Sequence, residues 1–241
     1  MPGIPVIATS VRHHFSMAKS SLMAGKHTFI EKPLASSVAQ CEELVALASQ
    51  RRLILMVGHT FLYSPAVRKI KEIVANGDIG EIRYISSRRL NLGLFQKDIN
   101  VTWDLAPHDL SIILYVMEEV PQSVVCYGDA HITPGIEDVT NLYLSFRRNR
   151  AAVVHSSWLD PRKIREMTFV GSERMIVYDD VANLEKIKIY DARVERPPGR
   201  GRLRRVVTAR RHGRLPPGDG RRREHPSRRP LRARGLRARE G

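Results

Sequence analysis

Short apolar runs alternate with stretches of helical apolar spacing along residues 4–58. The runs are typical of strands, and they occupy Val6–Thr9, His27–Glu31 and Leu53–Val57. The last run is apolar throughout, as in a strand covered on both faces. Residues 14–24 and the segment after Ser37 space their apolar residues as helices do. This order of strands and helices predicts an α/β fold with a parallel sheet and right-handed crossovers over residues 1–62.

The pattern changes after Ser64-Pro65, where a serine followed by a proline is typical of a helix start. One further helix is predicted at about residues 105–117. Strand-like segments joined by short polar links make up most of the rest: Ile82–Leu90, Ser123–Gly128, Thr140–Phe146, Ala151–Trp158, Ile164–Val170, Met175–Tyr178 and Lys186–Tyr190. Many strands without intervening helices predict an α+β domain with a mostly antiparallel sheet over residues 63–190.

Charge is distributed unevenly along the 241 residues, whose formal net charge is +15. Residues 200–241 hold 16 Arg and three acids, so they carry +13, and the preceding residues carry only +2. A nearly neutral body excludes a basic nucleic-acid-binding domain as the default. Residues 191–241 show no apolar period, which predicts a disordered tail. Such a tail either binds nucleic acid through phosphates or is the translation of a GC-rich gene in the wrong frame.

Other features narrow the class of protein. Cys41 and Cys126 lack metal-ligand spacing, and each is interpreted as a small core residue, so no metal site is expected. No run is long and apolar enough for a membrane span, and no secretory signal is visible, so a cytoplasmic protein is expected. The tail lacks aromatic residues for base stacking, which makes nucleic acid an unlikely partner.

Polar residues follow all three predicted parallel strands. Thr9 and His14 follow the first strand, Glu31-Lys32-Pro33 follows the second, and Gly58-His59 follows the third. Ligands of open α/β sheets bind beyond the carboxyl ends of the strands, so these residues are expected to meet at one edge. For each of them the alternative is a loop or helix-capping role.

A second group lies at the predicted helix 105–117. Asp104 is expected to cap this helix, with Pro107 in its first turn and His108 facing the same site as Asp104. A carboxylate close to an imidazole is expected to raise the pKa of His108. The alternative is a structural cap beside a surface histidine. The pair Arg88-Arg89 either meets an anionic substrate group or lies on a solvated strand edge.

Together these motifs resemble the glucose–fructose oxidoreductase / inositol dehydrogenase / rhizopine-catabolism (Gfo/Idh/MocA) family. The resemblance covers about residues 4–190. It rests on five short motifs in the family's order: Ile7-Ala8-Thr9 with His14, Ala24-Gly25-Lys26-His27, Glu31-Lys32-Pro33-Leu34-Ala35, Val57-Gly58-His59 and Asp104-x-x-x-His108. It implies half of a Rossmann-type dinucleotide-binding domain over residues 1–62, followed by a substrate and oligomerisation domain over residues 63–190.

The resemblance also implies a function. It implies an oxidoreductase that transfers a hydride between NAD or NADP and a sugar, inositol or nucleotide-sugar, in a homo-oligomer. By resemblance, His108 is the general acid/base, Asp104 is its partner, and Lys32 contacts the reacting oxygen and tunes His108. Residues along the cofactor are then Thr9, His14, Glu31, Lys32, Pro33 and His59.

The chain also departs from the family pattern. It contains no G-x-G-x-x-G motif, and it begins at what resembles the family's fourth strand, which predicts weak NADH binding or none. Two alternatives therefore stand beside the dehydrogenase. One is an inactive gene fragment of such an enzyme. The other is a protein that binds nucleic acid through its Arg-rich tail.

Overall fold

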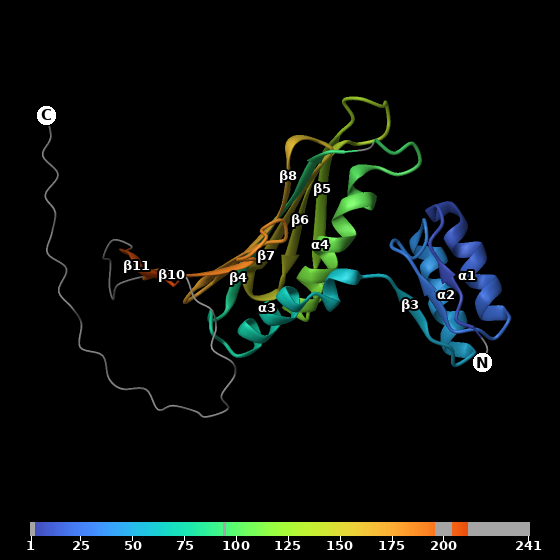
Figure 1. The fold of residues 1–241 in the computed structure, drawn as a ribbon, viewed down its shortest axis with the longest axis horizontal. Coiled ribbons are helices and arrows are strands. Elements are labelled where there is room, and N and C mark those ends of the chain that lie inside the picture. The colour runs from blue at the N-terminus through green and yellow to red at the C-terminus, as the bar shows by residue number, and fades with distance from the viewer. Residues whose placement is uncertain (1–2, 94, 196–203, 212–241) are drawn as a thin grey trace, which may run out of the picture.

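The computed structural model describes residues 3–93, 95–195 and 204–211. Two units with separate hydrophobic cores make up this part of the chain (Figure 1). The first unit is a small parallel sheet with helices, and the second is a large, mostly antiparallel sheet with two helices on one face. The fold class predicted from the apolar pattern is confirmed.

The first unit contains three strands, β1 (Val6–Ile7), β2 (Thr28–Ile30) and β3 (Leu55–Val57), paired in parallel in the order β1-β2-β3. The helices between them are α1 (His14–Met23), preceded by the short 3-10 helix η1 (Val11–His13), and α2 (Val38–Gln50). Ser37 caps α2, because its Oγ accepts a hydrogen bond from the backbone N–H of Gln40 at 3.3 Å. Gly25, with a φ of 70°, follows the end of α1, as expected of a glycine in that position.

One expectation for this unit is wrong. Leu53–Val57 is not covered on both faces, because Met56, which points to the opposite face from Leu55 and Val57, is 37% exposed. The core instead gathers residues from α1, α2 and β2, namely Ala18, Leu22, Ile30 and Leu44. This core holds the ends of the three strands in place.

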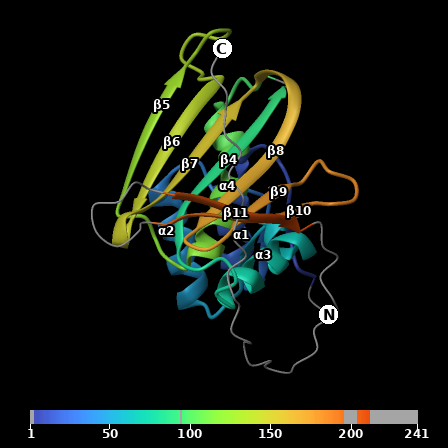
Figure 2. The same ribbon diagram turned by 90° about the vertical axis from the view of Figure 1, so that its left-hand side faces the viewer.

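The second unit begins after the 3-10 helix η2 (Thr60–Tyr63), with α3 (Pro65–Ala75) and α4 (Val101–Met117). Its strands are β4 (Ile82–Leu92), β5 (Ser123–Asp129), β6 (Val139–Phe146), β7 (Arg150–Ser157), β8 (Leu159–Gly171), β9 (Met175–Asp179), β10 (Ile187–Glu195) and β11 (Arg204–Arg211), with η3 (Arg147–Asn149) between β6 and β7. They pair in the order β11-β10-β9-β8-β4-β7-β6-β5 (Figure 2). All neighbours are antiparallel except β4 and β7.

The core of the second unit lies between this sheet and the helices α3 and α4. Alternate residues of each strand face the helices, such as Ile85 on β4, Val154 on β7 and Phe169 on β8. Ile112 and Ile113 of α4 pack against them. Figure 1 shows α4 between the large sheet and the first unit, so one face of this helix lies on the sheet and another faces the small unit.

Three further expectations are corrected. Helix α4 starts at Val101 with Asn100 as its cap, so Asp104 is in the first turn and Pro107 lies inside the helix. Cys126 is exposed, because β5 is an edge strand and all its residues are exposed.

The third correction concerns the tail. The predicted boundary at residue 190 is wrong, since β10 continues to Glu195 and pairs with β11. The β-branched run Val206–Thr208 suits a strand. The other residues of the predicted tail, 196–203 and 212–241, lie outside the described part of the chain.

Candidate functional site

Lys32 joins the two units at the carboxyl end of β2. Its Nζ donates a hydrogen bond to the carbonyl oxygen of Asp104 at 2.7 Å and lies 3.5 Å from the Asp104 Oδ1. The side chains of Lys32 and Asp104 are 18% and 26% exposed. The Lys32–Pro33 peptide bond is cis. The structure therefore brings together two residues that are far apart in the sequence and that the motifs singled out separately.

Asp104 has a second partner on the large sheet. Its Oδ2 accepts a hydrogen bond from Nε1 of Trp158 at 3.2 Å, and the Trp158 side chain is fully buried. Asp104 also lies in the first turn of α4, where the helix dipole favours a carboxylate. With one oxygen facing Lys32 and the other bonded to Trp158, the carboxylate is firmly oriented.

His108 lies one turn further along α4. Its ring packs edge-on against Phe61, with centroids 5.1 Å apart. Its Nδ1 is buried and has no hydrogen-bond partner among the described residues. Burial, followed by the positive charges of Arg89, Lys32 and Arg165, lowers the pKa of His108 to about 3.

The pKa of His108 therefore shifts opposite to the direction expected from the sequence. The expected cause was the nearby Asp104, but that carboxylate is engaged by Lys32 and Trp158. Cations and burial dominate the surroundings of the imidazole instead. At neutral pH His108 is uncharged, and its unprotonated nitrogen can accept a proton.

A buried ion pair lies behind His108. Arg89 donates to both carboxylate oxygens of Asp109, at 2.9 and 2.8 Å, and the two side chains are 5% and 2% exposed. The Arg89 guanidinium also stacks on Phe61, 4.8 Å from the ring centroid. Phe61 thus contacts both Arg89 and the catalytic candidate His108.

Neither interpretation of Arg88-Arg89 describes this arrangement. Strand β4 is central rather than at an edge, and alternate residues face opposite sides, so Arg89 points into the core while the exposed Arg88 pairs with Glu166 at 2.7 Å. The signal was present in the alternation Ile85, Ser87, Arg89, which puts all three on the buried face. Only the tertiary structure showed that Arg89 is buried under α4, where its charge is balanced by Asp109.

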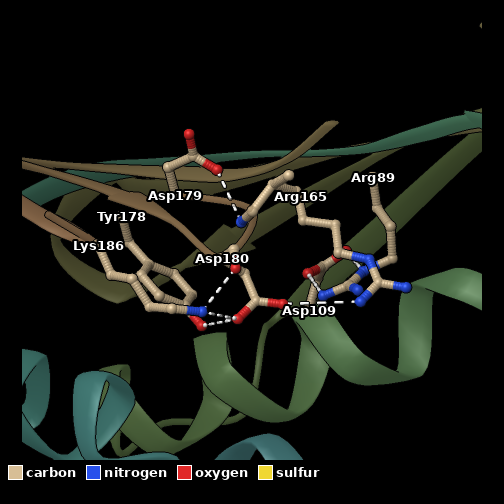
Figure 3. A network of polar contacts seen from close by, with 8 residues as sticks. Arg89, Asp109, Arg165, Tyr178, Asp179, Asp180 and Lys186 are labelled. Atoms are coloured by element: carbon tan, nitrogen blue, oxygen red, sulfur yellow. Dashed lines mark hydrogen bonds and ion pairs between the residues drawn. The ribbon is translucent and has the colours of Figure 1, made fainter. Parts of the chain in front are cut away.

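A further polar network lies next to Arg89 on the same face of the sheet (Figure 3). Asp180 accepts a hydrogen bond from the Tyr178 hydroxyl at 3.1 Å and one from the Lys186 Nζ at 3.1 Å. Arg165 lies 3.6 Å from the other oxygen of Asp180. Burial of Tyr178 beside this carboxylate raises the pKa of the phenol. The sequence motifs pointed to none of these residues.

The residues predicted to lie along a cofactor differ in their surroundings. His14 is buried, and its ring nitrogens lie 2.8 Å from the carbonyl oxygen of Pro33 and 3.0 Å from that of Thr9. The His14 ring therefore lies between the loops that follow β1 and β2 and links them. Thr9 is exposed, and its hydroxyl makes only long contacts within the described residues.

Glu31 and His59 keep free polar atoms at the strand ends. The Glu31 carboxylate lies against Gly58, where an added Cβ would come within 3.0 Å of its Oε1, and it makes no hydrogen bond to a described residue. His59 has a buried Nδ1 without a described partner, and burial lowers its pKa. Unpaired polar atoms at the carboxyl ends of strands suit a polar ligand such as a nicotinamide ribose.

An apolar cavity of about 600 Å³ lies between the first unit and α4. Pro33, Leu34 and His59 line one side of it, and Trp103 and Leu114 line the other. Trp103, which the sequence did not assign to core or site, also lines a smaller cavity of about 280 Å³ together with Asp98 and Glu137.

The residues present fit only part of a dinucleotide site. Lys32, Glu31 and His59 suit the nicotinamide end, but no glycine-rich turn for the pyrophosphate occurs in the sequence. Among the residues that the structure describes, no group of three or more His, Cys, Asp or Glu could hold a metal ion. No helix in this part of the chain could cross a membrane.

Comparison with known families matches most of the two units. Residues 2–59 match the model described as "Oxidoreductase family, NAD-binding Rossmann fold", and residues 67–177 match the GFO/IDH/MocA C-terminal domain. The chain is similar to UDP-N-acetylglucosamine 3-dehydrogenase of Acidithiobacillus ferrooxidans, at 27% identity over 73% of this chain and 55% of the relative. It is also similar to the uncharacterized oxidoreductase YrbE of Bacillus subtilis, at 30% identity over 60% of this chain and 45% of the relative.

Solved structures agree with these matches. The A. ferrooxidans dehydrogenase superposes with a TM-score of 0.67 and 26% identity, over 85% of this chain and 64% of that one. An inositol dehydrogenase homologue from Azotobacter vinelandii, complexed with NADH and myo-inositol, shares the fold with a TM-score of 0.71 and 17% identity, over 84% and 55% of the two chains. The chain spans about half the length of the first relatives it matches. With both domain models matched in order, this chain belongs to the GFO/IDH/MocA family of NAD-binding oxidoreductases.

Proposed function

We propose that these residues form the catalytic end of an NAD-dependent dehydrogenase that oxidises a hydroxyl group of a sugar, inositol or nucleotide-sugar, or reduces the corresponding ketone. The observation that carries the proposal is the meeting of Lys32 with Asp104, one turn from the uncharged His108. This set combines a cation and a proton acceptor at the carboxyl end of a parallel strand. The names of the relatives support a sugar-like substrate.

Each residue has a role that follows from its surroundings. His108, uncharged at neutral pH, accepts the proton of the substrate hydroxyl as the carbon gives up its hydride. The Lys32 ammonium stabilises the negative charge that develops on that oxygen. Asp104, held by Trp158, orients Lys32. NAD, when bound, supplies the hydride acceptor, and Glu31 with His59 would hold its nicotinamide end.

The proposal also concerns the choice of cofactor and the oligomeric state. NADP is the alternative cofactor. NAD and NADP differ at the 2′ position of the ribose, and the residue that contacts this position in the family is not among the motifs present. A homo-oligomer is the proposed assembly. Its support is an exposed face of the large sheet, opposite the helices, that carries Tyr84, Val125, Tyr127 and Tyr143.

Binding of the nicotinamide end of the cofactor can be tested with a ligand that needs no glycine-rich turn for a pyrophosphate. Reduced nicotinamide mononucleotide, NADH and NADPH are titrated into the full chain, and the histidine ring signals are followed by NMR. We expect the rings of His108 and His59 to shift, and those of the remote His131 and His155 to stay. Absence of any shift at His108 and His59 contradicts the proposal and favours an inactive fragment.

Catalysis is tested on the protein with myo-inositol and UDP-N-acetylglucosamine as substrates. We expect His108→Ala to lower kcat by about 10²–10⁴-fold, the range for loss of a general acid/base. His155→Ala, on a partly buried histidine of β7 whose ring bonds Asn141, is the matched control and should leave kcat unchanged. Full activity of His108→Ala rules out its assigned role.

A nucleic-acid-binding tail is not favoured by any described residue. The part of the predicted tail that the structure describes is paired in a β-hairpin with β10. Deletion of residues 212–241 leaves this β10–β11 pair in the chain, and we expect cofactor binding to be unchanged. Salt-dependent retention on a DNA column that disappears with the deletion would support the tail as a second function.

A further inference from the structure

Two arginines lie directly opposite each other beside the proposed site. Arg89 of β4 and Arg165 of β8 are register partners in an antiparallel pair. Both face α4, because Arg165 shares the alternation of the buried Met167 and Phe169, and Arg89 that of Ile85. Like charges directly opposite each other destabilise a sheet, so each needs a counter-ion.

The two arginines are compensated very differently (Figure 3). Arg89 is buried and makes two hydrogen bonds to Asp109. Arg165 is 38% exposed, and a guanidinium nitrogen lies 3.6 Å from a carboxylate oxygen of Asp180, an ion pair that is too long for a hydrogen bond. One edge of the Arg89 guanidinium, Nε and Nη2, is therefore held by Asp109, whereas the Arg165 guanidinium makes no hydrogen bond to another residue that the structure describes.

Asp180 does not depend on Arg165. It accepts hydrogen bonds from Tyr178 and Lys186, and Lys186 also donates to its carbonyl oxygen at 2.6 Å. Burial raises the pKa of Asp180, but these hydrogen bonds outweigh burial and the net shift is downward. The charge of Arg165 also lowers the pKa of Asp180, but it is the smallest of these causes, so Arg165 is available to a second anion.

Arg165 is also close to the reacting residues. Its register partner Arg89 stacks on Phe61, whose ring packs against that of His108. The positive charge of Arg165 also helps to lower the pKa of His108, after burial, Arg89 and Lys32. A guanidinium with open N–H groups near the proton acceptor matches a carboxylate or phosphate bidentately. A surplus of positive charge around an uncharged imidazole favours an anionic ligand over a neutral one.

We propose that Arg165 binds an anionic group of the substrate, a carboxylate or a phosphate, and so selects an acidic or phosphorylated sugar over a neutral one. This inference rests on the proposed function, because it assigns the substrate class of the same site. Arg165 is a specificity-determining residue, and it takes no part in proton or hydride transfer.

The test uses three probes of one size class: D-glucuronate for the carboxylate, D-glucose 6-phosphate for the phosphate and D-glucose as the neutral control. Each is titrated into the full chain at constant ionic strength, and the ring signals of His108 are followed by NMR. We expect at least one anionic probe to shift His108 with a Kd about 10- to 100-fold lower than that of glucose, the range for charge-assisted hydrogen bonds. The stronger anionic probe identifies which group the site takes.

Variants assign the effect to Arg165. Arg165→Met should remove the preference for the anion. Arg165→Lys should restore it in part, because lysine keeps the positive charge but lacks the planar guanidinium that binds an anion through two N–H groups. Arg162→Met, on an exposed arginine of the same strand, is the matched control and should change nothing. Retention of near-native thermal unfolding by Arg165→Met shows that the fold is intact.

Two results overturn the inference. One is equal affinity for glucose and the anionic probes, and the other is an anion preference that survives in Arg165→Met. If reduced nicotinamide mononucleotide still shifts His108 in that case, the dehydrogenase proposal stands and only the substrate class falls. If neither the sugar probes nor reduced nicotinamide mononucleotide shifts the ring signals of His108, both proposals are wrong.

Discussion

The ammonium of Lys32 lies 2.7 Å from the carbonyl oxygen of Asp104, and this contact ties the end of β2 to the first turn of α4. It connects two units whose hydrophobic cores are separate. The same cation is one of the groups that lower the pKa of His108. One side chain therefore both holds the site together and sets the proton affinity of its acid/base.

Replacement of Lys32 by methionine is expected to raise the pKa of His108 toward its ordinary value. The reason is loss of one of the neighbouring positive charges, while burial and Arg89, both larger causes, remain. The shift is measured by NMR titration of the histidine ring. Lys19→Met, which removes a half-exposed ion pair with Glu43 far from the site, is the control. An unchanged pKa in Lys32→Met would show that its charge does not reach the imidazole.

Replacement of Arg89 by methionine is expected to destabilise the fold by about 3–5 kcal/mol, because it leaves Asp109 buried without a counter-ion. The double variant Arg89→Met/Asp109→Leu should recover much of this loss, since it buries no charge. Urea unfolding measures both.

Arg88→Met is the matched control for this pair. It breaks the exposed pair with Glu166 and should cost about 0–1 kcal/mol. If Arg88→Met and Arg89→Met lowered the free energy of unfolding equally, Arg88 and Arg89 would not lie on an exposed and a buried face of β4.

Acidification is expected to destabilise the protein between about pH 6.5 and pH 3. The pKa of His108 is about 3 in the folded state and near 6.5 when the chain unfolds, so within this window the unfolded state binds more protons. The free energy of unfolding is therefore highest above pH 6.5 and falls as the pH is lowered toward 3. His59, whose pKa is also lowered, contributes in the same direction.

Urea midpoints across this pH range measure the effect. The variant His108→Gln, uncharged at every pH, should flatten the dependence. His155→Gln provides the comparison on a histidine outside the site. A His108→Gln curve parallel to that of the parent protein would refute the assignment.

Alanine at Gly171 is expected to destabilise the second unit by about 1–3 kcal/mol, the usual range for overpacking. An added Cβ there would collide with the backbone carbonyl of Ile79, which cannot move aside as a flexible side chain can.

Gly25→Ala is the comparison for Gly171→Ala. Space around Gly25 is open, so only its φ of 70° opposes a side chain, at about 1–2 kcal/mol. Thermal unfolding separates the two variants, and a smaller loss at Gly171 than at Gly25 would contradict the packing argument.

The sequence by itself determined the order of helices and strands, the parallel first sheet and the mostly antiparallel second one. These depend on local apolar periods and capping residues such as Ser37, which act over a few positions. Short motifs also pointed to Lys32, Asp104 and His108. Burial was harder to predict, because the apolar run Leu53–Val57 indicated coverage on both faces, whereas Met56 of β3 is exposed.

Only the tertiary structure decided which charges meet. The carboxylate of Asp104 turns to Lys32 and Trp158, and the pKa of His108 falls instead of rising. Arg89 is bonded to Asp109, whereas the Arg165 guanidinium makes no hydrogen bond within the described part of the chain, although both are arginines on paired strands. Burial and charge–charge distances are set by contacts between distant segments, so no local pattern encodes them.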